Sequence, residues 1–259
     1  MAPHAHVPRL FVLAGTNGAG KSSIGGATIR ARGAEYFNPD EAAARIRQAQ
    51  PHLSATQANS AAWHEGKRLL QHAIANGLDY NFETTLGGKS FATLLKAAAD
   101  QGYEVRIWYV GLASPEHHLA RVKARVKKGG HDIPEADIRR RFDQSRLQLI
   151  ELLPHLAELR VYDNSEEADP HRGQAPKPRL VLHWQQRNRG AKAEHQAVVL
   201  VPATASDLMN TPDWVKPVVM AALKQQTELQ PAKPVATTTT AIKAVTPAGA
   251  RPKRNRPAK

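Results

Sequence analysis

Short apolar runs alternate with longer amphipathic segments over the first 165 residues of the chain. Residues 10–14 (LFVLA) form a continuous apolar run, which is typical of a strand buried on both faces, and further strands are predicted at 35–38, 79–83, 104–112 and 158–162. The segments between them predict helices at 22–32, 40–50, 54–76, 90–101, 115–128 and 134–153. Strands that alternate with helices predict an α/β fold, with a parallel sheet covered by helices on both faces.

The pattern changes after Ser165. Residues 179–184 and 196–201 predict two antiparallel strands, and residues 213–226 predict a terminal helix. From Thr227 onward the chain is rich in Pro, Ala, Thr and Lys, which is typical of disorder. We therefore expect a main domain at 7–165, a small C-terminal extension at 166–226 and a disordered basic tail at 227–259.

Composition excludes several classes of protein. Hydrophobic residues make up 41% of the 259 residues, which is enough for one sizeable core. The chain has no cysteine, so disulfides and thiolate chemistry are excluded and a reducing cytoplasm is expected. No apolar run reaches the roughly 20 residues of a membrane-spanning helix, and residues 1–9 lack the layout of a secretory signal.

The formal net charge of +13 is unevenly distributed. Residues 233–259 contain seven Lys or Arg and no acid, so thirteen minus seven leaves +6 for the rest of the chain. A mildly basic body suits a small anionic substrate as well as nucleic acid. The tail is also able to hold nucleic acid through counterion release, although a solvated tail is the simpler interpretation.

A phosphate-binding loop (P-loop) follows the first predicted strand and opens the first predicted helix. It matches G-x-x-x-x-G-K-[ST] in full, with Gly15, Thr16, Asn17, Gly18, Ala19, Gly20, Lys21 and Ser22, and Ser23 follows. Glycines let main-chain N–H groups converge on phosphates, and the helix directs its positive end at them. We expect ATP here, with Lys21 on the β- and γ-phosphates and Ser22 as a ligand of Mg²⁺.

Polar side chains follow two further predicted strands. Asp40 comes just after the second strand, and Glu83, Thr84 and Thr85 end the third. Ligands of open parallel sheets lie beyond the carboxyl ends of the strands, so these groups are expected near the P-loop. Asp40 then suits a general base for an acceptor hydroxyl or a member of the Mg²⁺ shell. The alternatives are a plain helix cap at Asp40 and turn residues at the end of the third strand.

Arginines flank a pair of glycines in the fifth and sixth predicted helices. Arg121 and Arg125 share one helix face, Gly129 and Gly130 follow, and the next helix carries Arg139, Arg140 and Arg141. Two basic helices about a glycine hinge predict an Arg-rich lid that closes over transferring phosphates. A solvated basic helix pair or a nucleic-acid surface is the alternative.

Two absences bear on the reaction. The strand at 104–112 ends in Gly-Leu rather than in an acid that activates water, and the chain has no Asn-Lys-x-Asp guanine motif. Small-molecule kinases tolerate both absences. The sequence therefore favours transfer of the γ-phosphate to a hydroxyl over hydrolysis.

The motifs together resemble the zeta toxin family of P-loop kinases, in its chromosomal, zeta-like branch. The resemblance rests on GTNGAGKSS (15–23), FNPD (37–40), NFETTL (81–86), RVKKGGHDIPEADIRRRF (125–142) and YDNS (162–165). It implies a P-loop kinase fold and phosphorylation of a nucleotide sugar, UDP-N-acetylglucosamine, with ATP and Mg²⁺. A protein antitoxin that blocks the ATP site is the family's precedent for a partner.

The resemblance also implies roles for single residues. Lys21 matches the phosphate lysine, Asp40 the general base, and Glu83 and Thr85 the substrate-binding acid and threonine. The lid arginines that bind the triphosphate match Arg125 and Arg141, with Arg140 as the alternative to Arg141. For a second substrate-binding acid on the long helix, Glu65 is the candidate by type and Lys67 by spacing. The other function that the sequence leaves open is a nucleic-acid-binding NTPase that uses the lid and the tail.

Overall fold

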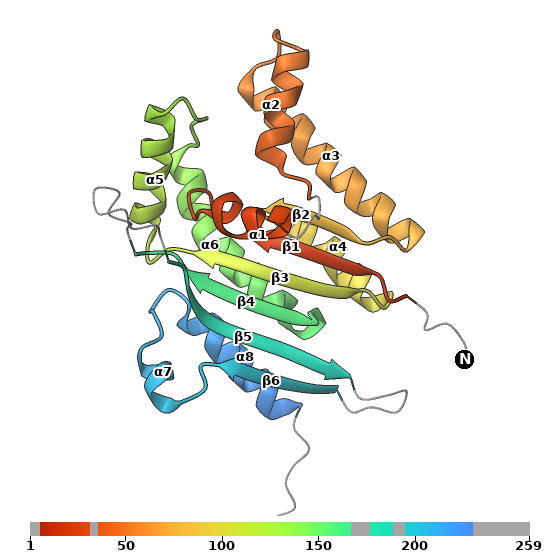
Figure 1. The fold of residues 1–259 in the computed structure, drawn as a ribbon, viewed down its shortest axis with the longest axis vertical. Coiled ribbons are helices and arrows are strands. Elements are labelled where there is room, and N and C mark those ends of the chain that lie inside the picture. The colour runs from red at the N-terminus through yellow and green to blue at the C-terminus, as the bar shows by residue number, and fades with distance from the viewer. Residues whose placement is uncertain (1–5, 32–35, 167–176, 189–194, 230–259) are drawn as a thin grey trace, which may run out of the picture.

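The computed structural model describes residues 6–31, 36–166, 177–188 and 195–229 (Figure 1). Its strands are β1 (Arg9–Ala14), β2 (Tyr80–Thr84), β3 (Glu104–Gly111), β4 (Glu158–Asp163), β5 (Arg179–Asn188) and β6 (His195–Val201). They form one six-stranded sheet in the order β2-β1-β3-β4-β5-β6. The first four strands of that order are parallel, whereas β5 and β6 are antiparallel to their neighbours.

Helices occupy most of the segments between the strands. They are η1 (Ser22–Gly26, a π-helical turn), α1 (Ala27–Ala31), α2 (Pro39–Ala49), α3 (Ala55–Asn76), α4 (Lys89–Asp100), α5 (Pro115–Lys127), α6 (Glu135–Leu152), the 3₁₀ turn η2 (Leu153–His155), α7 (Ala205–Met209) and α8 (Lys216–Glu228). Figure 1 shows α4, α6 and α8 behind the sheet, with α2 and α3 projecting as a pair beyond β1 and β2. The predicted α/β fold with a largely parallel sheet is confirmed.

Local signals in the sequence explain several helix ends. Ser54 begins α3 with a capping box, Ser114 caps α5, and Gly77 ends α3 in the left-handed conformation at φ 66°. The helix predicted at 90–101 is α4, and it begins one residue earlier than predicted. That helix begins at Lys89 after Gly88, which makes no side-chain cap.

The predicted strand at 35–38 is not a strand over its described residues. Only Phe37 pairs, in a single parallel bridge with Phe82 at the outer edge of β2. Its N–H donates to the carbonyl of Asn81 at 2.9 Å, and its carbonyl accepts from the N–H of Glu83 at 2.8 Å. This short bridge is enough to hold the start of α2 beside the carboxyl end of β2.

The main core lies between the sheet and the row of helices α4, α6 and α8. Val12, Ile107 and Leu159 point into it from β1, β3 and β4, and each is 0% exposed. On the opposite face, η1 covers β1 and β3, where Ile24 of η1 packs against Leu13 and Val110.

Beyond that cover the second face of the sheet is polar. Glu158 on β4 accepts hydrogen bonds from Arg106 at 3.2 Å and from Arg160 at 2.7 Å, and lies 2.9 Å from Nε2 of His183. Charged side chains on β3, β4 and β5 thus pair with one another on this face of the sheet. Among the described residues, the predicted helical cover of both faces is therefore incomplete.

Residues after 165 extend the same sheet and the same core. Leu182 and Trp184 of β5 and Val218 of α8 are 0% exposed within the main cluster. The predicted tail starts too early, because Thr227 and Glu228 are still helical. The rest of the tail, 230–259, lies outside the described residues. The division into three parts, with its first boundary at 165, stays a prediction.

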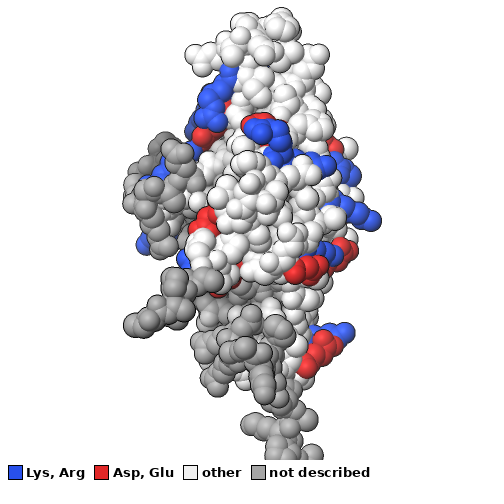
Figure 2. Space-filling view, turned by 90° about the vertical axis from the view of Figure 1, so that its right-hand side faces the viewer, with Lys and Arg blue, Asp and Glu red and all other residues white. Residues whose placement is uncertain are grey.

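The surface carries charges of both signs. On the face drawn in Figure 2, the described Lys and Arg are scattered, and several lie beside an Asp or Glu rather than in one basic patch. Arg68 and Glu65 of α3 form an exposed ion pair of this kind at 2.7 Å. Within the described ranges, no helix is both long and apolar enough to cross a bilayer.

Replacing Trp214 tests whether the C-terminal segment folds with the rest. Its ring is 5% exposed and covers Gly111 of β3, where an added Cβ would lie 2.2 Å from the indole. We expect Trp214→Ala to lower the free energy of unfolding by about 3 kcal/mol, as large core truncations do. Chemical denaturation followed by circular dichroism measures this.

The matched control is Met220→Ala on α8, since Met220 is 58% exposed. Its effect is expected to stay within about 0.5 kcal/mol. Two separate unfolding transitions, with Trp214→Ala affecting only one of them, would show that the segment after 165 is an independent unit.

Candidate functional site

The loop between β1 and η1 has the backbone of a phosphate cradle. Gly15, Gly18 and Gly20 all have positive φ, at 139°, 83° and 89°. At Gly15 an added Cβ would lie 2.1 Å from the carbonyl oxygen of Val110, so no side chain fits there. The sequence therefore forms the compact loop that the P-loop motif predicts.

Buried side chains from three elements support this loop. Thr16 is 0% exposed, and its hydroxyl lies 3.4 Å from that of Ser145 on α6. Ser145 in turn lies 2.6 Å from the hydroxyl of Tyr109 on β3. After β4, Asn164 donates from Nδ2 to the carbonyl of Ala19 at 2.8 Å. Polar contacts from α6 and from the residue after β4 therefore hold the loop, in addition to apolar packing.

Lys21, Ser22 and Glu83 form a compact cluster at the end of the loop. Lys21 Nζ lies 3.4 Å from a carboxylate oxygen of Glu83, and both side chains are 7% exposed. Ser22 donates to the other carboxylate oxygen at 2.8 Å. Ser23, the last residue of the predicted ATP site, is exposed in η1. The structure therefore joins the predicted phosphate lysine and metal ligand to the predicted substrate acid.

Asp40 lies in the first turn of α2 and is not the helix cap. Asn38 caps this helix, with its side-chain oxygen accepting from the N–H of Asp40 at 3.0 Å. The interpretation of Asp40 as a plain cap is therefore wrong. Its carboxylate is 55% exposed and pairs at 3.4 Å with Arg125 of α5, which also donates to the carbonyl of His131 at 2.9 Å.

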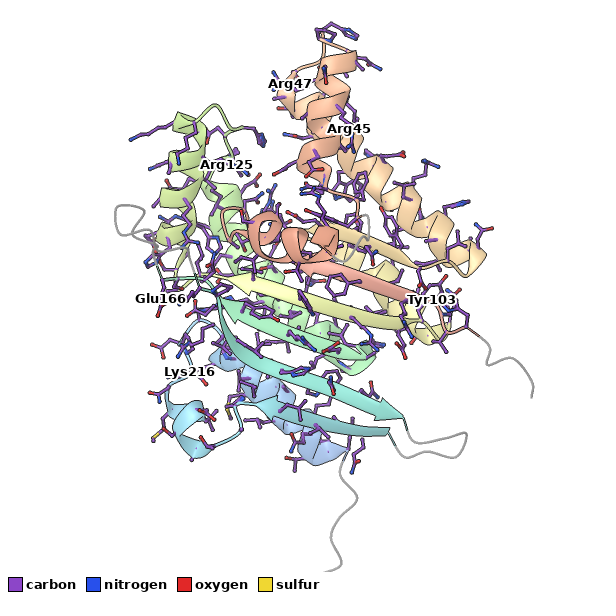
Figure 3. All side chains as sticks on the ribbon, in the orientation of Figure 1. Arg45, Arg47, Tyr103, Arg125, Glu166 and Lys216 are labelled. Carbon is purple, nitrogen blue, oxygen red and sulfur yellow. The ribbon has the colours of Figure 1, made fainter. Side chains whose placement is uncertain are left out.

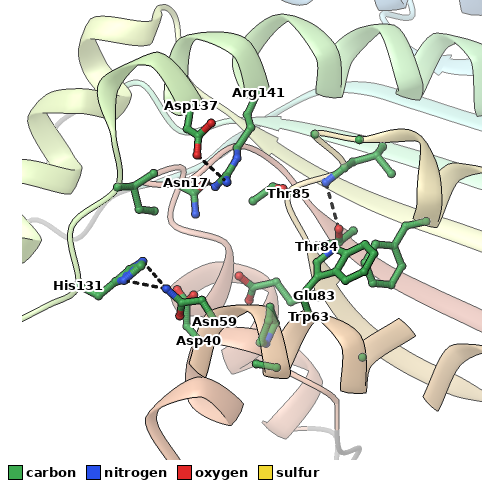
Figure 4. Close-up of a pocket in the computed structure, with 18 of the residues that line it drawn as sticks. Asn17, Asp40, Asn59, Trp63, Glu83, Thr84, Thr85, His131, Asp137 and Arg141 are labelled. Carbon is green, nitrogen blue, oxygen red and sulfur yellow. Dashed lines mark hydrogen bonds and ion pairs between the residues drawn. The ribbon is translucent and has the colours of Figure 1, made fainter. Parts of the chain in front are cut away.

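A cavity of about 740 Å³ lies next to this cluster, between the P-loop, α2, α3 and the segment that joins α5 to α6 (Figure 4). Its lining contains the predicted substrate residues Asp40, Glu83 and Thr85, together with Asn17 from the P-loop. Pockets of this size commonly hold small-molecule ligands. The cavity therefore has a size suited to a small-molecule ligand.

The arginine triplet of α6 splits into two groups. Arg139 pairs with Glu116 and Glu135 at 2.7 Å each, whereas Arg140 and Arg141 line the cavity. Arg141 donates to the side-chain oxygen of Asn17 at 2.8 Å. Of the two alternatives at this position, Arg141 is the one that touches the P-loop. Its role in catalysis stays a prediction, as does closure of α5 and α6 as a lid.

Two side chains of α6 have shifted pKa values. The hydrogen bond from Arg140 lowers the pKa of Asp137 below its usual range. Burial lowers the pKa of the Arg141 guanidinium, but an arginine stays charged at neutral pH. Asp137 thus forms ion pairs with both Arg140 and Arg141 on α6.

Sequence reasoning missed the face of α3 that lines the cavity. Thr56, Asn59, Trp63 and Gly66 lie on it, at helical spacing. Trp63 is 36% exposed, and Asn59 Nδ2 lies 3.3 Å from Nε2 of His131 across the cavity. The spacing defines one face of the helix but does not indicate whether that face meets a cavity or the core.

The expected second acid is not on this face. Glu65 pairs with Arg68 at the surface, and neither Glu65 nor Lys67 is among the described residues that line the cavity. On α2, Arg47 does line it. Figure 3 shows Arg47 on α2 and Arg125 on α5, the helices on either side of the site.

A second residue missed from the sequence is His118 on α5. It is 1% exposed, and its Nδ1 lies 2.8 Å from the carbonyl oxygen of Asn17. Burial lowers the pKa of His118 to about 4, so its imidazole is neutral at physiological pH. No motif marks this residue, because its burial arises only from tertiary packing.

Comparison with protein families gives one match that covers most of the chain. The family described as "Zeta toxin" matches residues 2–174. An uncharacterized protein of Haemophilus influenzae is 34% identical over 132 residues, which is 49% of this chain and 88% of that protein.

Solved structures share the fold at low sequence identity. The crystal structure of AvrRxo1-ORF1:AvrRxo1-ORF2 with sulphate ions aligns at a TM-score of 0.53 and 16% identity, covering 69% of this chain but only 59% of that longer chain. The same complex with ATP aligns at 0.52 and 18% identity, with the same coverage. A structure from the PezAT chromosomal toxin-antitoxin system of Streptococcus pneumoniae aligns at 0.50 and 15% identity, covering 87% of this chain and 88% of that one.

Proposed function

This chain belongs to the zeta toxin family, and on that premise we propose that it is an ATP-dependent kinase that phosphorylates a hydroxyl group of a small molecule. One observation carries the proposal. The Lys21–Ser22–Glu83 cluster of the P-loop adjoins a cavity that Asp40 also lines. A donor site and a carboxylate suited to deprotonate an acceptor therefore lie around one space.

In this proposal each charged group has a separate task. Lys21 and the main-chain N–H groups of the P-loop bind the triphosphate, and Arg125 and Arg141 neutralise charge that develops during transfer. Asp40 accepts the proton of the attacking hydroxyl. Its ion pair with Arg125 joins the predicted base, which lines the cavity, to a predicted lid arginine.

Magnesium fits the chemistry of the residues present. Mg²⁺ prefers oxygen ligands and is commonly held by one or two protein groups plus substrate phosphates. The Ser22 hydroxyl and the Glu83 carboxylate, 2.8 Å apart, offer such oxygens beside Lys21. When bound, the ion would neutralise phosphate charge, and these two residues would hold it directly or through water.

For the acceptor we propose a nucleotide sugar, with UDP-N-acetylglucosamine as the first candidate by family membership. Two features of the cavity support this class. Trp63, packed edge-on against Phe91 with ring centroids 5.8 Å apart, offers an aromatic surface for a flat ring. Arg47 adds a cation for an anionic group such as a diphosphate. A protein antitoxin as partner is a further proposal that rests on family membership alone.

The direct test incubates the full chain with labelled ATP, Mg²⁺ and a panel of nucleotide sugars. Mass spectrometry of the products then identifies a phosphorylated acceptor. Failure with every nucleotide sugar would reject this class of acceptor. ATP consumption that needs no acceptor and rises with added RNA or DNA would instead favour a nucleic-acid-dependent NTPase.

Asp40→Asn tests the general base. We expect kcat to fall by roughly 10²–10⁴-fold with ATP affinity nearly unchanged, because the base acts on the acceptor. Steady-state kinetics and calorimetric titration of ATP measure the two effects. The control is Glu41→Gln, the neighbouring acid, which pairs with Arg30. Full turnover in Asp40→Asn would show that Asp40 is not the base.

Glu83→Gln tests the metal shell. We expect the Mg²⁺ concentration needed for tight nucleotide binding to rise roughly tenfold, as for other changes next to a metal site. Nucleotide affinity measured across a Mg²⁺ series gives the readout, with Glu65→Gln on the surface of α3 as the control. An unchanged Mg²⁺ dependence would show that Glu83 does not hold the metal, and would leave contact with the acceptor as its proposed role.

Trp63→Ala tests the aromatic surface. Stacking on an aromatic side chain contributes about 1–3 kcal/mol per base, so we expect KM for the accepted nucleotide sugar to rise roughly tenfold. The value of kcat should change little, and Trp63→Phe should retain most of the affinity. Equal KM values in Trp63→Ala and the unchanged protein would contradict ring recognition by this residue.

A further inference from the structure

His118 is in direct contact with the P-loop but belongs to none of the roles above. It lies on α5, is 1% exposed, and its Nδ1 is 2.8 Å from the main-chain oxygen of Asn17. A carbonyl oxygen only accepts, so Nδ1 must carry the proton. Because the ring is neutral near pH 7, Nε2 is then unprotonated, and the tautomer of this buried imidazole is defined by the P-loop.

We propose that His118 is a positioning residue for nucleotide binding: by holding the carbonyl of Asn17 it fixes the peptide that links Asn17 to Gly18 in the orientation that receives phosphate. The inference rests on the proposed function, since it assumes that the P-loop binds a nucleotide. His118 contacts the P-loop and not the reacting atoms.

The geometry of the peptide bond explains the effect. A trans peptide is planar, so the carbonyl of one residue and the N–H of the next point in opposite directions. Holding the Asn17 oxygen toward α5 therefore turns the N–H of Gly18 away from α5. Main-chain N–H groups that point out of the loop are what a phosphate cradle needs.

Close packing leaves the loop little freedom to place this peptide differently. An added Cβ on Gly18 would lie 2.8 Å from the main-chain oxygen of His118, so the two backbones abut. The Asn17 side chain is held separately, by Arg141 of α6 at 2.8 Å. Asn17 is thus attached to both helices that carry the predicted lid arginines.

A purely structural role is the competing explanation. The His118 ring packs edge-on against Phe142 with centroids 5.7 Å apart, so it also fills space in the core. Two substitutions separate the roles. His118→Phe keeps the ring but removes the donor. His118→Asn keeps an N–H donor at the position of Nδ1 but loses most of the ring.

The experiment measures affinity for the imido analogue of ATP, with Mg²⁺, by calorimetric titration of the full chain. Thermal unfolding confirms that each variant is folded at the temperature used. We expect His118→Phe to bind roughly tenfold more weakly, as when a buried hydrogen bond is lost. His118→Asn should stay within about threefold of the unchanged protein, even if it is the less stable variant. His117→Phe, an exposed neighbour on α5, is the control and should not change affinity.

The outcomes are distinct. Unchanged affinity in His118→Phe, or an equal loss in both His118 variants, would overturn the proposal in favour of packing alone. No binding by the unchanged protein would overturn this inference and the proposed function together. If the expected order of affinities holds but no acceptor is phosphorylated, the positioning role stands and the proposed reaction fails.

Discussion

The buried contact between Lys21 and Glu83 is the constraint on which the site depends. Both side chains are 7% exposed, and a buried charge without a partner is strongly unfavourable. Burial of either charge is therefore tolerated only when the fold brings the other one beside it. One comes from the P-loop after β1 and the other from the end of β2, so the contact depends on these strands being parallel neighbours. Their register, which aligns Leu13 with Glu83, supplies that arrangement.

The same sheet edge places the acceptor side of the site. The bridge at Phe37 attaches the start of α2 to β2 and brings Asn38 to within 3.4 Å of the Ser22 hydroxyl. Because Asn38 caps α2, the Asp40 side chain is not needed as the helix cap. Its carboxylate pairs with Arg125 instead. A helix cap, a one-residue bridge and an ion pair thus bring together the groups that are proposed to act on the phosphate donor and on the acceptor.

Features that depend on local sequence were predictable. The loop at 15–22 needs glycine at strained positions and a strand and helix on either side, all of which are visible in the sequence. Ser54, Ser114 and Gly77 define helix ends by local hydrogen bonds and by conformation. The prediction of a strand at 35–38 was wrong, because the hydrophobic pattern cannot show that only Phe37 pairs with a neighbouring strand. His118 and Trp63 could not be assigned either, since a helical sequence does not specify which face meets the loop, the cavity or the core.

The arrangement also has a consequence for how charge is managed. Lys21 is paired with Glu83, Arg125 with Asp40, and Arg141 with Asp137, so each of these three cations faces a carboxylate of the chain itself. A triphosphate brings several negative charges that compete for the same cations. In the proposed kinase, binding of the triphosphate to Lys21, Arg125 and Arg141 would exchange ion-pair partners rather than create all its ion pairs anew. This exchange would free Asp40 and Glu83, the carboxylates proposed to act on the acceptor and the metal. Under that proposal, one set of ion pairs would couple phosphate binding to preparation of the acceptor side.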